Sequence, residues 1–85
     1  MKNVEFSKIQ SEVEAYCSFG IKNMKTIGTL EDLRSEYNYR YGILEGIERV
    51  LKFIDVDDKY LLYEKISSLK DELTKEMRNQ IKRLI

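Results

Sequence analysis

One apolar stripe constrains this chain more than any other feature of its sequence. From residue 30 to residue 54, apolar side chains recur at steps of three and four, which is the period of an α-helix. The stripe consists of Leu30, Leu33, Tyr37, Tyr41, Leu44, Ile47, Leu51 and Ile54. Thr29 and Asp32 stand in the arrangement of a capping box, which marks where a helix begins. The chain contains no proline that would break the pattern, so we predict a helix over residues 30–54.

A second stretch with helix period precedes this one, and we predict a helix over residues 3–25. Its apolar stripe consists of Phe6, Ile9, Val13, Tyr16, Cys17 and Met24. Gly20 falls inside the stretch, and the sequence leaves open whether the helix stops there or continues. Continuation is favoured because Met24 stays on the same stripe. We expect Cys17 to be a buried small apolar residue, since nothing near it in sequence would make a thiol reactive.

A third stretch predicts a helix over residues 58–84. Its narrow stripe consists of Leu62, Ile66, Leu69, Leu73, Met77, Ile81 and Leu84. Asp57 or Asp58 is expected to cap this helix, and capping explains these acids better than metal binding does. Because the connector is short, the second and third helices should form an antiparallel hairpin. The sequence therefore predicts one all-α domain over residues 1–85, a long antiparallel helical hairpin plus an N-terminal helix, in a three-helix arrangement.

The composition excludes several classes of function. The chain of 85 residues has no histidine and one cysteine, so it offers no histidine base, no catalytic triad and no internal disulfide. Fifteen basic and fifteen acidic residues give a formal net charge of zero, which argues against general attraction to nucleic acid or anionic lipid. No apolar run approaches the roughly 20 residues of a membrane helix, and the start lacks a signal-peptide core. We expect a cytoplasmic protein with no enzymatic activity and no cofactor.

The helix predicted over residues 30–54 is apolar around most of its circumference. A second apolar set on another side of it consists of Tyr39, Gly42, Ile43, Gly46, Val50 and Phe53. A helix that is apolar on two sides must be covered on two sides. The third helix can cover one of them, whereas the first helix, a second copy or another protein must cover the other. Because the two sides are far apart for a compact three-helix bundle, we expect a flatter arrangement or one that self-association completes.

Two glycines lie at the centre of this second apolar set. Gly42 and Gly46 are spaced four apart on one side of the helix, and together they cost about 2 kcal/mol in helix propensity. Close approach of another helix would offset this cost, and we favour it over the alternative that the glycines make room for neighbouring tyrosine rings. A two-fold homodimer is the favoured assembly. A monomeric three-helix bundle and a hairpin completed by a different protein stay open.

The C-terminal segment supports a second hypothesis about function. Lys75, Arg78, Lys82 and Arg83 stand close together, and the last nine residues contain no acid. Such a cluster can contact nucleic-acid phosphates. Basic residues at the end of a helix also complement its dipole without any partner, and we prefer this interpretation. A small nucleic-acid-binding accessory protein stays the alternative.

Two neighbouring segments carry a resemblance to known proteins. Residues 36–42 (EYNYRYG) and residues 46–51 (GIERVL) combine an aromatic-rich turn, a glycine and a hydrophobic run. In this pattern the chain resembles small uncharacterised helical proteins of low-GC Gram-positive bacteria and their phages. The resemblance implies a short accessory or regulatory protein that acts through contacts and carries no catalytic residue. We therefore expect a protein-interaction module, a homo-oligomeric regulator or inhibitor encoded by a phage or mobile element, whose partners are itself and another protein.

Overall fold

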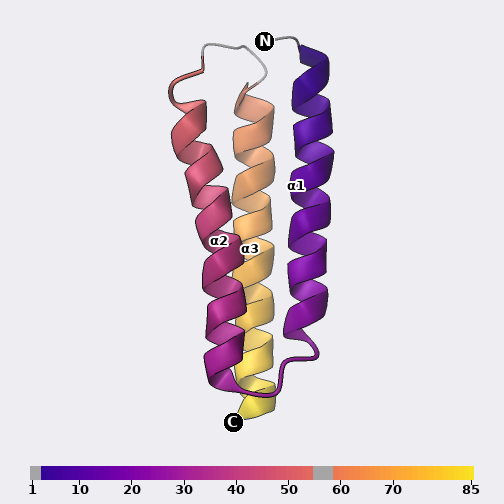
Figure 1. Cartoon of the computed structure of the whole chain (residues 1–85), viewed down its shortest axis with the longest axis vertical. Coiled ribbons are helices and arrows are strands. Elements are labelled where there is room, and N and C mark those ends of the chain that lie inside the picture. Colours follow the sequence, from indigo (N-terminus) through magenta and orange to yellow (C-terminus); the bar gives the residue numbers. More distant parts are fainter. Residues whose placement is uncertain (1–2, 55–58) are drawn as a thin grey trace.

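Three long helices make up the computed structural model, which describes residues 3–54 and 59–85. They are α1 (Asn3–Met24), α2 (Leu30–Leu51) and α3 (Lys59–Leu84). The helices run side by side in a rod of 46 × 18 × 15 Å, and consecutive helices are antiparallel (Figure 1). The predicted all-α fold, with a long hairpin and an N-terminal helix, is confirmed. Within the described residues, no helix combines the length and the apolar character that crossing a membrane requires.

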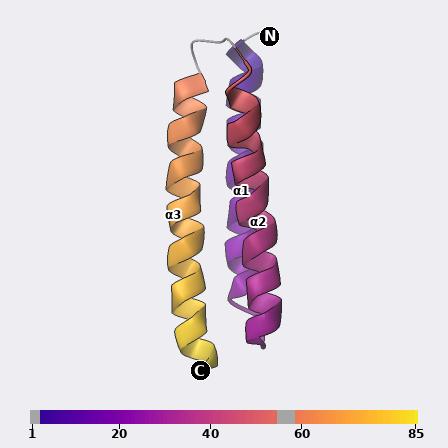
Figure 2. The ribbon, with the colours of Figure 1, turned by 90° about the vertical axis from the view of Figure 1, so that its left-hand side faces the viewer.

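The helices form two layers. All three pairs of helices are in contact. α1 and α2 lie next to each other in one layer, and α3 packs against one side of that layer (Figures 1 and 2). The core between the layers consists of Val13, Cys17, Met24, Leu33, Leu44, Leu51, Leu62, Ile66, Leu69 and Leu73. Each helix thus buries the middle of the stripe that its sequence predicts, because α3 sits in the groove between α1 and α2; Leu30, at the start of the α2 stripe, is exposed.

The ends of α2 show how local sequence sets its length. Thr29 has extended backbone, and its hydroxyl accepts a hydrogen bond from the Asp32 N–H at 3.1 Å, as the capping pattern predicts. At the other end, α2 stops at Leu51, three residues before the predicted end at residue 54. The Phe53 N–H donates to the carbonyl of Val50 at 3.0 Å, so the last turn tightens to three-residue spacing. The predicted capping of α3 by Asp57 or Asp58 lies outside the described residues.

α1 continues through Gly20 to Met24, which answers the question that the sequence left open. No described glycine has a positive φ, so Gly20 does not end the helix as a left-handed cap. A Cβ atom added at Gly20 would lie 2.9 Å from Cγ of Arg40 on α2. The glycine therefore makes room for a side chain of the neighbouring helix.

Polar contacts fix the register of the hairpin. The hydroxyls of Tyr37 and Thr74 are 2.8 Å apart, and Nζ of Lys70 lies 2.8 Å from Oε1 of Glu48. The hydrogen bond with Glu48 raises the pKa of Lys70. These contacts lie on the side of α2 that faces α3, so they leave the rest of the helix to α1 and to solvent.

Candidate functional site

The second apolar side of α2 is largely uncovered. The exposed fractions of Tyr39, Ile43, Val50 and Phe53 are 60%, 41%, 58% and 89%. Gly42 is exposed and Gly46 is half-buried, and a Cβ atom added at either would meet no atom within 4 Å beyond its own stretch of helix. The structure thus places five of the six predicted interface residues on one open side of α2, and Phe53 in the turn just after the helix. Within the described chain, neither another helix nor a tyrosine ring occupies the space over the two glycines.

α1 adds further apolar surface beside this side of α2. Phe19 is 59% exposed, and Ile9 and Tyr16 are half-buried. The Tyr16 ring meets the Tyr39 ring edge to face, with ring centroids 6.2 Å apart. Phe19 was not predicted as an interface residue, because it lies off the apolar stripe of the first helix and a single apolar residue there forms no periodic pattern. We use the name α1–α2 face for the surface formed by Ile9, Tyr16, Phe19, Tyr39, Gly42, Ile43, Gly46, Val50 and Phe53.

Two apolar hollows lie between α1 and α2 and share Ile9 and Ile47 as walls. The first has a volume of about 280 Å³ and extends past Val50 and Ile54. The second has a volume of about 300 Å³ and extends past Ile43 toward Tyr16, with Glu12 as the one charged residue in its wall. The side chains of the two helices therefore leave a shallow apolar groove along the α1–α2 face.

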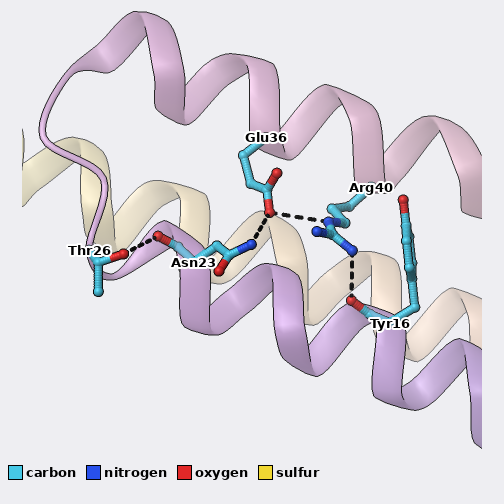
Figure 3. Close-up of polar contacts among 5 residues, drawn as sticks. All are labelled: Tyr16, Asn23, Thr26, Glu36 and Arg40. Atoms are coloured by element: carbon cyan, nitrogen blue, oxygen red, sulfur yellow. Dashed lines mark hydrogen bonds and ion pairs between the residues drawn. The ribbon is translucent and has the colours of Figure 1, made fainter.

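A buried arginine joins α1 to α2 at the edge of this face. Nε of Arg40 lies 3.1 Å from Oε2 of Glu36, and a guanidinium nitrogen donates to the Tyr16 carbonyl at 3.3 Å. Asn23 donates to the same Glu36 oxygen at 3.0 Å (Figure 3). The guanidinium carbon lies 4.2 Å from the centroid of the Tyr16 ring, within range of a cation–π interaction. Arg40 thus lies among the rings of Tyr16, Phe19 and Tyr39 and holds this part of the face in shape.

The four basic residues of the C-terminal segment do not form one cluster. Arg83 donates to the carbonyls of Met24 at 3.3 Å and Ile27 at 2.5 Å, so it ties the end of α3 to the end of α1. Lys75, Arg78 and Lys82 are exposed, and helix spacing places them on one outward face of α3. Asp71 lies one turn before Lys75 and is also exposed. The structure therefore brings three of the four basic residues together, next to an acidic residue that weakens their positive electrostatic potential.

The side chains that could take part in chemistry are buried or dispersed. Cys17 is fully buried, and burial raises the pKa of its thiol to about 11. Burial also raises the pKa of Tyr16. Across residues 3–54 and 59–85, no three His, Cys, Asp or Glu side chains gather in a group that could hold a metal ion. The α1–α2 face is thus the most prominent candidate site. Comparison of the chain with protein-family models, with curated protein sequences and with solved structures finds no match.

Proposed function

We propose that this chain is a non-enzymatic protein-interaction module that works with its α1–α2 face covered by another polypeptide chain. The observation that carries the proposal is the exposure of Phe19, Tyr39 and Val50 on one side of a single helical layer. Contiguous apolar surface of this kind on a small protein is typical of interaction sites. Each Å² of it removed from water contributes about 25 cal/mol to association.

The chemical character of the face supports the same function. From residue 41 to residue 54, aromatic and aliphatic groups and the two glycines form the face, and Glu45 and Arg49 lie at its border rather than within it. Interface centres in general are depleted in charge and enriched in aromatic residues. The face is also held in shape before binding, because Arg40 fixes Tyr16 and the helix layer beneath it. Little conformational freedom is then lost when a partner binds.

A regulator or inhibitor is the kind of interaction protein that fits these features. A chain of 85 residues with one such face acts by occupying a surface of its partner and excluding others from it. The resemblance of residues 36–51 to small phage and Gram-positive proteins supports the same role. We place this activity in the cytoplasm.

Site-specific photo-crosslinking in the cells that produce the protein tests the proposal. A benzophenone amino acid replaces Val50 on the face in one variant and Ser67, exposed on α3, in a matched control. We expect a discrete crosslinked product from position 50, identified by mass spectrometry, and none from position 67. Equal labelling at both positions, or no product at position 50, would contradict the proposal.

A further inference from the structure

We propose that the chain covering the α1–α2 face is a second copy of this protein, which packs antiparallel along α2 with the two-fold axis at Gly46. The inference rests on the proposed function and names its partner. In such a pair, a residue that precedes Gly46 by some number of positions lies opposite the residue that follows it by the same number. Gly42 then lies opposite Val50 of the second copy, and Tyr39 lies opposite the turn that follows its α2 and carries Phe53.

The shapes of the paired residues are complementary in this register. The space over Gly42 and Gly46 is open to beyond 4 Å, and Val50 projects beside it with 58% of its surface exposed. Val50 of the second copy fills the space over Gly42, and the bare backbone at Gly46 lets the two helices approach closely. A parallel pair would instead set Gly42 against Gly42 and Val50 against Val50. The two glycines would leave a gap between the helices, and the two valine side chains would collide.

The same register matches the two hollows of the groove. Along the axis of α2, Ile43 of the second copy lies level with the hollow beside Val50, and Val50 of the second copy lies level with the hollow beside Ile43. Each copy therefore supplies the aliphatic groups that the other lacks. One two-fold axis generates both exchanges, which is the property expected of a self-complementary surface.

Charges at the border of the face complete the match. Glu45 and Arg49 flank the apolar set on its outer side, and neither forms an ion pair with another described residue. The antiparallel register sets Arg49 opposite position 43 of the second copy, two residues from its Glu45, which is within reach of these long side chains, and the reverse pair forms by symmetry. The net charge of zero adds no general repulsion between copies. A second copy therefore satisfies shape, hollows and charge together.

Disulfide trapping tests the register. Gly46→Cys should form an intermolecular disulfide under mild oxidation, since its side chain meets nothing within the chain and lies on the axis. A mixture of the Tyr39→Cys and Phe53→Cys chains should form the mixed 39–53 disulfide. Ser67→Cys is the control for random collision, and the native Cys17 stays buried and silent. The proposal would be overturned if the Tyr39→Cys chains and the Phe53→Cys chains each formed disulfides only with their own kind. Disulfide formation no faster than that of Ser67→Cys would overturn it as well.

A mixing experiment tests whether Glu45 of one copy pairs with Arg49 of the other. Its design separates this contact from the interaction between Glu45 and Arg49 within one helix. The Glu45→Arg chain carries two bases at the border, and the Arg49→Glu chain carries two acids. Repulsion inside each helix is the same in every dimer, so only pairing between copies differs. We expect the mixed dimer to form with an affinity about tenfold higher than that of either homodimer, measured by sedimentation. Equal affinities would show that these residues do not meet.

The two proposals fail in different ways. A chain that stays monomeric at hundreds of micromolar, with no trapped disulfide, overturns the second copy as partner. If position 50 nevertheless crosslinks one identified protein other than this chain, the interaction function stands and its partner is that protein. If neither trapping nor crosslinking gives a product, both proposals are overturned.

Discussion

Arg40 shows how a buried charge can be accommodated between two helices of a small protein. Taking a guanidinium out of water is costly unless hydrogen bonds and an opposite charge replace the water. Here the Glu36 carboxylate, the Tyr16 carbonyl and the Tyr16 ring replace it. The sequence sets Glu36 and Arg40 four residues apart, the spacing at which an acid and a base pair along a helix. It did not predict the burial, because that depends on space left by Gly20, which is twenty residues away in the chain.

The first prediction compares glycines that have opposite surroundings. Gly42→Ala should raise the free energy of unfolding by up to about 1 kcal/mol in dilute solution, since the added methyl meets nothing and alanine favours helix. Gly20→Ala should lower it by about 1 kcal/mol, because the clash with Arg40 outweighs the gain in propensity. Urea denaturation measures both. In an Arg40→Ala background, Gly20→Ala should no longer lower the free energy of unfolding. If Gly20→Ala instead stabilises the original chain, the Arg40 side chain moves away from position 20 at little cost.

The second prediction concerns Cys17 and alkaline pH. Burial raises the pKa of its thiol to about 11 from 9.0. Between these pH values the thiol ionises mainly in the unfolded chain, so the stability that is fully present below pH 9 declines as the pH rises through 11, by about 3 kcal/mol at most. Cys17→Ala should flatten this part of the stability–pH curve, measured by urea denaturation. Parallel curves for the two proteins would contradict it. A thiol reagent should label native Cys17 only as fast as the chain opens.

Among the three helices, α2 is the one whose buried residues were best predicted from the sequence. Its main stripe predicted the core, and Leu33, Leu44 and Leu51 are indeed buried. Its early end was not predictable, because tightening of the last turn depends on the local path of the chain. The contribution of α1 to the face was missed for a related reason: the exposure of Phe19 is set by the lateral placement of whole helices, which periodicity does not encode.

The third prediction concerns the contact between the ends of α1 and α3. Arg83 donates to two carbonyls near the end of α1, whereas its neighbour Lys82, which is also exposed, makes no side-chain hydrogen bond with the described residues. Arg83→Ala should therefore lower the free energy of unfolding by about 1–2 kcal/mol, since charged hydrogen bonds to helix-end carbonyls are lost. Lys82→Ala should change it by no more than a few tenths of a kcal/mol. Hydrogen exchange at residues 24–27 should rise only in the first variant; equal effects would show that Arg83 acts by charge alone.

The molecule as a whole is a helical layer that is covered on one side. α3 packs against one side of the α1–α2 layer (Figure 2), and the other side carries exposed apolar groups that include Phe19, Tyr39 and Val50. A domain of this length buries only about 60% of the surface that its unfolded chain exposes, so its own core leaves little excess stability. Association along the uncovered side would add the burial that the single chain lacks. Stability and function then depend on the same surface.

The last prediction uses this coupling of stability to association. If copies associate, the melting temperature of the protein should rise with concentration, because dimerisation removes folded chains from the unfolding equilibrium. Gly46→Glu should abolish that dependence: a carboxylate at this open position leaves the single chain folded but would be desolvated between copies. Ser67→Glu on the exposed surface of α3 should keep it. Calorimetry over a dilution series measures all three proteins, and a Gly46→Glu chain with unchanged concentration dependence would place the association surface elsewhere than on α2.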